Sequence, residues 1–321
     1  MTSRKVVYRL WVLSIAFFMT MTLSSFSVTE TPDEGMAYSC IEVPTSVEFC
    51  GKRIDLSRFD RHERMDRELL AFAYMHSTSI QMLKRANRYF PVVEPILKKN
   101  NIPDDFKYLM IIESGGNPTA RSYAGAVGLW QFMPATAKSY GLEVNGFIDE
   151  RYDIEKATEA ACKYFHEAYE LYGNWESVAA SYNAGKGRIS QQLSKQDVTT
   201  SLDLHLVEET ARYVYRILAA KMMFADPAKF GFRLRESDLY PQIPYTVVKT
   251  NQTIDNLSDF AQKHGITYAI LKNMNPWLRD TSMPCSGRKT YSIKIPTKQG
   301  LYYNPKNTEA HMKSTIHPSK R

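Results

Sequence analysis

The feature that most constrains the fold is a long succession of helical patterns, which runs from Arg61 to about Ala225. Apolar residues recur there at three- and four-residue spacing, most clearly in residues 155–172, where one face is apolar. Pro134 suits the first turn of a helix, and Gly173 suits the end of one. This region therefore predicts an all-helical domain with little or no sheet.

Prolines and capping residues set the expected helix boundaries. Pro91 is expected in the first turn of a helix of its own, so that residues 79–89 and 92–99 are separate helices. Asn174 is expected to cap the helix that follows it. The predicted helices span residues 65–75, 79–89, 92–99, 103–113, 134–141, 155–172, 175–184, 188–193 and 208–224.

Length and composition indicate a folded protein with a basic surface. The chain has 321 residues, of which 44% are hydrophobic, enough for one large domain or two modest ones. The formal net charge of +7 favours an anionic partner. The chain lacks the stripe of lysines and arginines interleaved with aromatics that is typical of nucleic-acid binding. A polymer that carries carboxylates fits equally well, and a generic basic surface remains the simpler alternative.

The N-terminus has the pattern of an export signal. Arg4, Lys5 and Arg9 precede an apolar stretch at 10–23, and small residues follow. We predict a secretory signal peptide at residues 1–27, cleaved near Ser27. The apolar stretch of about 14 residues is short of the ~20 that span a bilayer, and an uncleaved N-terminal anchor is the alternative.

The four cysteines suggest structural thiols. In an exported protein, Cys40 and Cys50 can close a short disulfide loop. Cys162 lies in a helical pattern and is expected to be a buried thiol, while the role of Cys285 stays open. No C-x-x-C pair is present and the histidines lack ligand spacing, so we expect no metal site.

A change of composition after Phe230 separates a second, smaller unit from the helical domain. Residues 245–249 alternate as a strand does, residues 254–265 and 268–274 have a helical period, and residues 289–295 alternate again. This order predicts a small α+β module of strand, helix, helix and strand. The predicted segments are 1–27 (signal peptide), 28–60 (lead-in or linker), 61–235 (helical domain), 236–244 (linker), 245–298 (small module) and 299–321 (basic, mobile tail).

Glu113 is the strongest catalytic candidate. It closes an apolar run at 108–112 and is followed at once by Ser114, Gly115 and Gly116. A carboxyl group in apolar surroundings loses the hydration that its charged form needs, so its pKa rises and it can hold a proton near neutral pH. Such a group suits general acid catalysis, for example the cleavage of a glycosidic bond.

Four motifs stand in one order along the helical domain. They are residues 113–118 (ESGGNP), 128–134 (GLWQFMP), 181–185 (SYNAG) and 209–214 (ETARYV). Together they resemble the lytic transglycosylases of bacterial cell walls, in the goose-type lysozyme superfamily, and most closely the membrane-bound D-type murein enzymes. The resemblance covers about residues 65–230. It implies a mainly α protein with a lysozyme-like helical catalytic domain, no cofactor, and the glycan strands of peptidoglycan as substrate and partner.

The small module resembles a LysM module, a fold that binds glycans containing N-acetylglucosamine. Residues 275–278 (NPWL) and 291–296 (YSIKIP) carry the resemblance. The sequence departs from the pattern at 251–254, where NQTI replaces the usual GDTL turn, and in an insertion at 283–288. The resemblance therefore implies the fold more strongly than it implies glycan affinity, and Trp277 is expected in the core of the module rather than as a sugar platform.

The resemblance also implies the reaction. Protonated Glu113 would protonate the oxygen of the β-1,4 bond between N-acetylmuramic acid and N-acetylglucosamine. The ionised Glu113 would then take a proton from the 6-hydroxyl, which closes a 1,6-anhydro ring. Ordinary glycosidases use a second carboxylate, and apart from Glu113 the first three motifs contain none. Asp149 and Asp153 are the nearest other candidates, although the sequence does not place them in the cleft.

The motifs also provide candidate substrate-binding residues. Tyr182 is the hydroxyl expected to hold Glu113 or the acetyl oxygen of the sugar, and the amide of Gln131 suits a sugar N-acetyl group. Trp130 is read equally well as an apolar wall and as core. Gly128 and Gly185 are expected to admit the glycan close to the backbone. The predicted substrate-binding residues are Ser114, Gln131, Met133, Tyr182, Asn183 and Tyr213.

Two other functions remain open at this point. One is a hydrolase of the lysozyme type, which needs a second carboxylate or an ordered water opposite Glu113. The other is a non-catalytic protein that binds the cell wall through the LysM-like module and the basic surface. In each case we expect an exported protein of the periplasm or cell envelope, and association with the membrane or with other cell-wall enzymes is left open.

Overall fold

The computed structural model describes residues 40–316 of the chain, and residues 41–316 belong to one compact unit. The predicted signal peptide at 1–27 lies outside the described residues, as do the last residues of the predicted tail. The described part is mainly α-helical with a small sheet-containing module, as the sequence predicts. Among residues 40–316, none of the helices is both long and apolar enough to cross a bilayer.

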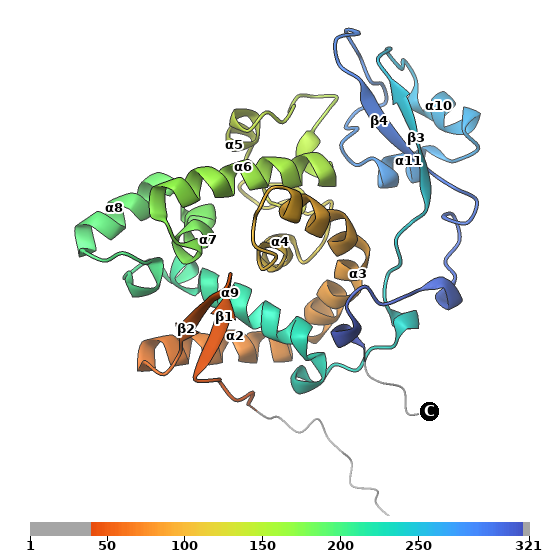
Figure 1. The fold of residues 1–321 in the computed structure, drawn as a ribbon. Helices are drawn as coiled ribbons and strands as arrows, with labels where there is room; N and C mark the ends of the chain where they lie inside the picture. Colours follow the sequence, from red (N-terminus) through yellow and green to blue (C-terminus); the bar gives the residue numbers. More distant parts are fainter. Residues whose placement is uncertain (1–39, 317–321) are drawn as a thin grey trace, which may run out of the picture. The chain divides into compact units, whose positions relative to one another are not determined.

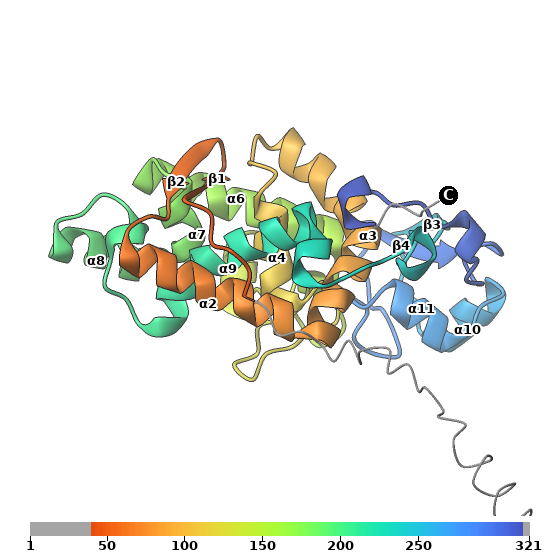
Figure 2. The same ribbon diagram turned by 90° about the horizontal axis from the view of Figure 1, so that it is seen from below.

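The helical domain is built around α4 (Phe106–Ser114), which runs through its centre with α3, α6 and α9 around it (Figures 1 and 2). Residues 106–112 are all buried, and this explains the apolar run that precedes Glu113. The other helices of the domain are α2 (Phe59–Tyr74), α3 (His76–Lys99), α5 (Pro134–Ser139), α6 (Ile154–Tyr172), α7 (Trp175–Ala184), α8 (Lys186–Gln196) and α9 (Glu208–Ala225).

The helix ends follow the capping signals in the sequence. Gly115 and Gly173 end α4 and α6 with φ angles of 60° and 63°, in the left-handed region that glycine adopts most easily. Asn174 caps α7 by accepting a hydrogen bond from the backbone N–H of Ser177, as predicted. Short 3₁₀ helices lie at Glu150–Tyr152, Ser201–Asp203, Pro227–Phe230, Glu236–Asp238, Pro305–Asn307 and Lys313–Thr315.

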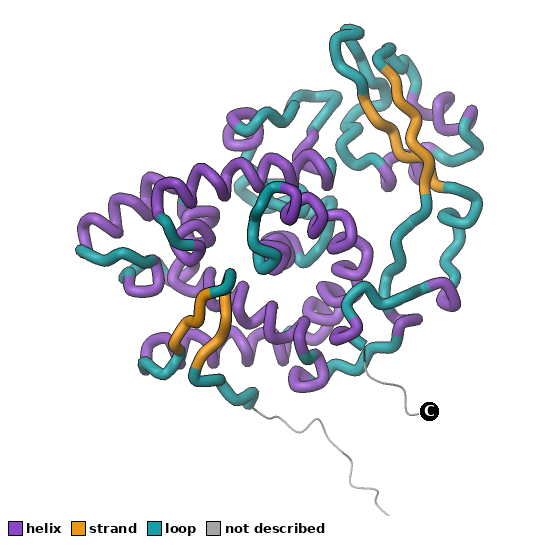
Figure 3. Tube along the Cα trace, viewed as in Figure 1, coloured by secondary structure: helices purple, strands orange, loops and turns teal. Residues whose placement is uncertain are grey.

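Helix α3 corrects one prediction. The separation of residues 79–89 from 92–99 at Pro91 is wrong, because α3 continues through Pro91 and Pro95 to Lys99. A proline within a helix removes a backbone donor and disfavours the helix. Here the buried face continues across the prolines through Phe90, Val93 and Leu97, and tertiary packing sustains the helix. Figure 3 shows the continuous helix.

A short hairpin precedes the helices, within residues 28–60, which were predicted to be a lead-in or linker. Strands β1 (Ser46–Phe49) and β2 (Lys52–Asp55) pair antiparallel, with Val47 opposite Ile54. Phe49, Ile54 and Leu56 are buried in the main core. The strands are four residues long, too short to show a clear alternation in the sequence.

The small module has the predicted order of elements. Its strands β3 (Tyr245–Thr250) and β4 (Tyr291–Pro296) pair antiparallel, and α10 (Leu257–Lys263) and α11 (Tyr268–Met274) connect them. Trp277 is 5% exposed and stacks on Tyr291 with 5.7 Å between the ring centroids, so it is a core residue as expected. Val127, Ile148 and Tyr152 of the helical domain belong to the same apolar core as this module.

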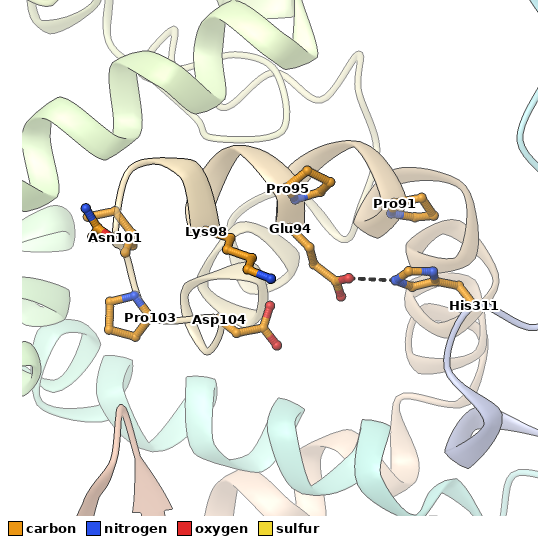
Figure 4. A pocket seen from close by; sticks show the side chains of 9 residues that line it. Pro91, Glu94, Pro95, Lys98, Asn101, Pro103, Asp104 and His311 are labelled. Atoms are coloured by element: carbon orange, nitrogen blue, oxygen red, sulfur yellow. Dashed lines mark hydrogen bonds and ion pairs between the residues drawn. The ribbon is translucent and has the colours of Figure 1, made fainter.

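The segment after the module is held on the helical domain, which corrects the prediction of a mobile tail for its described part. The backbone N–H of His311 donates to Asn87 Oδ1 at 2.8 Å, and the His311 ring contacts Glu94 Oε2 at 2.7 Å (Figure 4). Ser314 donates to the carbonyl of Phe224 at 2.9 Å, and Thr315 is buried. The polar character of this segment reflects hydrogen bonding to α3 and α9.

The cysteines in the described residues are free thiols. Cys40 is exposed and Cys50 is half-buried, so the disulfide considered between them is not formed. Cys162 is fully buried, which confirms that prediction, and Cys285 is a half-buried thiol. Burial raises the pKa of Cys162 to about 12, so this thiol stays protonated and unreactive.

Candidate active site

Glu113 lies in the last turn of α4, where the central helix ends at Gly115. Its side chain is half-buried, so a part of it remains accessible. Tyr213 of α9 donates a hydrogen bond from its hydroxyl to Glu113 Oε1. No ion pair involves Glu113 among residues 40–316. The site therefore offers a carboxyl group in largely apolar surroundings, oriented by one hydroxyl.

Burial raises the pKa of Glu113 to about 7, because the charged form loses its hydration. The hydrogen bond from Tyr213 and the positive charge of Arg216 oppose this shift, and the negative charge of Glu209 adds to it. A pKa near 7 leaves a large fraction of the group protonated at neutral pH and its conjugate base readily formed. The group can therefore serve both as an acid and as a base in one reaction.

One face of α9 supplies the surroundings of Glu113. Glu209, Tyr213 and Arg216 stand four and three residues apart, a spacing that places them on the same side of a helix. Arg216 also donates to the carbonyl of Ile112 at 3.4 Å. Of these three residues, only Tyr213 was predicted from the sequence as a site residue. Their separation from Tyr213, four residues for Glu209 and three for Arg216, was the sequence signal that could have identified them.

The loop that carries Gln131 is held by its own side chain. Gln131 has a φ of 47°, which a residue other than glycine adopts at a cost of about 1 kcal/mol. Its Nε2 donates to the carbonyl of Gly128 at 2.8 Å and to that of Ala120 at 3.3 Å. No hydrogen bond in the described part of the chain uses Oε1. This oxygen can accept a hydrogen bond from the N–H of a sugar acetamido group.

Gly128 has a different role from the one expected. A Cβ on this residue would lie 2.1 Å from the carbonyl oxygen of Arg151, so the close approach that requires glycine is made by the protein backbone and not by a glycan. Arg151 donates from Nη1 to the carbonyls of Gly125 and Phe132, each at 3.0 Å. Contacts with residues 149–151 thus hold the loop of the second motif in place.

The two apolar candidates of the second motif, Trp130 and Met133, differ in their exposure to solvent. Trp130 is fully buried and donates from Nε1 to Thr158 Oγ1 at 2.8 Å, so it is a core residue. Met133 is 42% exposed, which leaves its side chain available to contact a ligand. Exposed methionine forms an adaptable apolar surface.

The hydroxyl that holds Glu113 belongs to Tyr213 and not to Tyr182, for which this role was considered. Tyr182 donates to the carbonyl of Trp130 at 2.7 Å. It still lies close enough for the charge of Glu113 to raise its pKa, which burial raises first. Ser114 donates to the carbonyl of Met110 at 3.0 Å, one turn back along α4, and makes no hydrogen bond to Glu113.

Asn183 joins α7 to α9. Its Oδ1 accepts a hydrogen bond of 2.8 Å from Thr210 Oγ1. Its side-chain N–H groups have no hydrogen-bond partner within residues 40–316 and are free to donate to a ligand.

Hydrogen bonds join all four motifs. The first motif contacts the fourth through Glu113 and Tyr213, and the third contacts the second through Tyr182 and the carbonyl of Trp130. The third also contacts the fourth through Asn183. Segments up to 100 residues apart in the chain therefore meet at the end of α4.

Neither aspartate considered as a second carboxylate is available. Asp149 is buried and forms a bidentate pair with Arg151, with distances of 2.9 Å to Nε and 2.7 Å to Nη2. Asp153 caps α6 by accepting from the backbone N–H of Lys156 at 3.0 Å. Glu209, which is exposed, is the carboxylate whose charge acts on Glu113.

A pocket elsewhere on the helical domain contains none of the motif residues. It is lined by the C-terminal half of α3, by the connection to α4 and by His311 (Figure 4). Glu113 does not line it, so this pocket is not the candidate active site. The described residues also contain no group of three or more histidine, cysteine, aspartate or glutamate side chains placed to hold a metal ion.

Comparison with known families decides what kind of domain this is. Residues 91–201 match the family model described as the transglycosylase SLT domain. The chain carries an SLT domain. Residues 246–299 match the soluble lytic transglycosylase C-terminal LysM-like domain, so the SLT domain is followed by a LysM-like domain.

Individual known proteins also match parts of the chain. The chain is 28% identical over 241 residues to membrane-bound lytic murein transglycosylase D of Escherichia coli, covering 74% of this chain and 51% of that protein. The chain thus spans about half the length of this relative. It is 31% identical over 116 residues to the soluble lytic murein transglycosylase of the same organism, which covers 33% of this chain and 18% of that one. The crystal structure of the 70 kDa soluble lytic transglycosylase from Escherichia coli matches with a TM-score of 0.39 and 23% identity, over 54% of this chain and 28% of that chain.

Proposed function

We propose that this protein is a lytic transglycosylase that cleaves the β-1,4 bond between N-acetylmuramic acid and N-acetylglucosamine in peptidoglycan. The observation that carries the proposal is the single carboxyl group of Glu113, with its pKa raised to about 7 at the point where four motifs meet. The SLT domain and the names of its relatives support peptidoglycan as the substrate. No cofactor is required by this chemistry.

The first step is protonation of the leaving group. Glu113 gives its proton to the bridging oxygen, the bond from this oxygen to C1 of the muramic acid breaks, and the 4-hydroxyl of N-acetylglucosamine leaves. The carbonyl oxygen of the muramic acid's own acetamido group stabilises the positive charge at C1. Tyr213 keeps the Glu113 carboxylate oriented once it is charged, since its hydroxyl donates to Oε1.

The second step closes the ring. The Glu113 carboxylate removes the proton from the 6-hydroxyl, whose oxygen bonds to C1 and forms the 1,6-anhydro product. The acid is thereby regenerated and no water is consumed. The nucleophile is already part of the sugar, so it gains the advantage of proximity.

We assign the other site residues to substrate binding. Gln131 accepts from a sugar acetamido N–H through Oε1, Asn183 donates from its free side-chain N–H groups, and Met133 covers an apolar face of the glycan. Tyr182 and Ser114 place hydroxyl oxygens near the end of α4. In this proposal the catalytic domain spans residues 61–235, the LysM-like domain spans residues 245–298, and the protein is exported to the periplasm or cell envelope.

A hydrolase is the second candidate, favoured by the exposed carboxylate of Glu209. In that reaction Glu209 would activate a water molecule and the products would have reducing ends. In the lytic reaction Glu209 affects only the pKa of Glu113. Because it raises this pKa, replacing Glu209 with Gln is expected to lower the pKa of Glu113 while anhydro products continue to form.

Mass spectrometry of the soluble products from purified sacculi tests the proposal. We expect muropeptides with 1,6-anhydromuramyl ends, which are lighter by one water molecule than the hydrolysis products. Products with reducing ends alone would establish the hydrolase. Binding to sacculi with no release of soluble fragments would establish a non-catalytic wall-binding protein.

A further inference from the structure

The LysM-like domain is joined to the SLT domain by main-chain hydrogen bonds. The backbone N–H of Asp149 donates to the carbonyl of Trp277 at 2.9 Å, and the backbone N–H of Arg279 donates to the carbonyl of Phe147 at 2.8 Å. The guanidinium of Arg279 lies over the ring of Tyr152, 4.5 Å from its centroid. Residues 143–152 are therefore packed against the LysM-like domain through backbone, ring and apolar contacts.

Charged groups reinforce the same contact. Lys289 of the LysM-like domain places Nζ 2.8 Å from Glu143 Oε2 and 2.6 Å from Glu150 Oε1. Tyr291 donates to the same oxygen of Glu143 at 2.8 Å. Glu150 is 2% exposed, and a buried carboxylate is costly unless cations and donors satisfy it. Lys289 is thus part of what allows Glu150 to stay buried and charged.

Residues 149–151 in turn hold the loop of the second motif. Asp149 fixes the guanidinium of Arg151, which donates to the carbonyls of Gly125 and Phe132. The carbonyl of Arg151 packs against Gly128 so closely that no side chain fits there. Gln131 and Met133 lie within or next to the span that these contacts fix. Consecutive contacts therefore link Lys289 to the residues assigned to substrate binding.

Both chain connections of the LysM-like domain are fastened to α3. Before the domain, Asn87 Nδ2 donates to the carbonyl of Tyr240 at 3.2 Å, and Arg88 Nε donates to the carbonyl of Pro241 at 2.9 Å. After the domain, the same Asn87 Nδ2 donates to the carbonyl of Glu309 at 3.1 Å. A domain held at its entry, its exit and its face has little freedom to move as a tethered unit.

We propose that the LysM-like domain is a fixed support for the glycan-binding loop at 125–133, with Lys289 as a positioning residue that acts through Glu143 and Glu150. The domain thereby contributes to substrate affinity without itself having to touch the glycan. The activity part of this inference rests on the proposed function, whereas the structural part does not.

The test compares Lys289→Met with Lys263→Met in the full chain. Lys263 is an exposed lysine of the same domain whose side chain forms no hydrogen bond or ion pair in the described residues, so its replacement is a matched control. Amide hydrogen exchange of residues 125–133 is measured first, because it does not depend on activity. We expect Lys289→Met to speed exchange there, Lys263→Met to leave it unchanged and Lys289→Arg to restore the protection.

Steady-state kinetics on purified soluble glycan strands give the second readout. We expect Lys289→Met to raise KM by about tenfold, the effect of one lost hydrogen bond to the substrate, with kcat little changed. A merely destabilised enzyme would instead lose kcat through a smaller folded fraction. Glu143→Gln, which keeps the shape of the side chain and removes one partner of Lys289, is a milder variant in case Lys289→Met does not fold.

The outcomes separate the two proposals. A wild-type protein that releases no soluble product overturns the proposed function, while the exchange experiment still tests the support. Unchanged exchange at 125–133 in both Lys289→Met and Glu143→Gln, with the same KM as Lys263→Met, overturns the inference.

Discussion

Glu113 and Glu150 are glutamates of the same domain, and burial acts on both in the same direction. Burial raises the pKa of Glu113 to about 7, and nothing among its neighbours compensates fully. Burial also raises the pKa of Glu150, but hydrogen bonds from Lys156 and Lys289 outweigh it, and the net pKa falls below the ordinary value. The cationic partner, rather than burial, therefore decides which of the two carboxyl groups can work as an acid.

The location of the two groups agrees with this distinction. Glu150 lies beneath the contact with the LysM-like domain, where a permanent charge helps to fasten two elements. Glu113 lies at the end of α4, where its partner is a neutral hydroxyl that can stay bonded while the carboxyl group gains or loses a proton.

Replacing Glu113 with Gln should remove nearly all activity. Loss of a general acid and base costs on the order of 10³-fold in rate. Release of soluble muropeptides from sacculi measures it, and thermal unfolding serves as the control, because the neutral amide should leave the fold intact. A variant that keeps more than a tenth of the activity would show that another group supplies the proton.

The two glutamates should affect stability with opposite pH dependence. Glu113 has a higher pKa in the folded state, so its contribution is present at low pH and is lost as pH rises from 4.5 through about 7, by about 3 kcal/mol. Glu150 has a lowered pKa, so its contribution is present above the unfolded value and is lost as pH falls through the folded one.

Urea unfolding from pH 4 to pH 8 checks the prediction for Glu113. The stability of the wild type relative to Glu113→Gln should fall as pH rises across this range. A constant difference between the two proteins would mean that the pKa of Glu113 is the same in the folded and unfolded states.

Replacing Glu150 with Gln should lower the free energy of unfolding by about 2 kcal/mol, because Lys156 and Lys289 lose a charged acceptor. Glu159→Gln is a suitable control. Glu159 forms a pair with Lys99 in which the side chain of Lys99 is 72% exposed and that of Glu159 is 37% exposed, and pairs near the surface contribute less than about 1 kcal/mol. Equal effects of the two substitutions in urea unfolding at pH 7 would contradict a special role for Glu150.

Replacing Tyr213 with Phe should have the smallest effect, about tenfold in rate, the value of one hydrogen bond. The hydroxyl of Tyr213 stabilises the charged form of Glu113, so its removal should raise the pKa of Glu113 and move the alkaline limb of the pH–rate profile to higher pH. Tyr182→Phe is the matched control, because its hydroxyl donates to the carbonyl of Trp130. If Tyr182→Phe moved the alkaline limb of the pH–rate profile and Tyr213→Phe did not, the roles assigned to the two tyrosines would be reversed.

Much of the fold was predictable because local signals agree with the tertiary structure. The ends of α4 and α6 follow from glycines in the left-handed region, and the range of α11 follows from its period and from Pro276. Helix α3 was not predictable at Pro91, since a local proline signal competes there with burial of a continuous face. The described tail was likewise missed, because its hydrogen bonds to Asn87 join residues more than 200 positions apart.

In the candidate site, the catalytic acid was predictable from the sequence, whereas the residues around it were less so. Glu113 follows from an apolar run that ends in a glycine turn, and these are local features. The choice between Tyr182 and Tyr213 as its hydroxyl depends on which helix passes the end of α4, and sequence spacing does not contain this information. The role of Gly128 was misread for the same reason, because its neighbour is the backbone of Arg151.

Titration of the two carboxyl groups in one protein distinguishes their roles. Carbon-13 NMR of glutamate side chains, assigned with Glu113→Gln and Glu150→Gln, reports each pKa in the folded chain. We predict that Glu113 titrates near pH 7 and that Glu150 titrates below 4.5. Titration of Glu113 at or below 4.5 would contradict the account, because the group would then be ionised wherever a proton donor is needed.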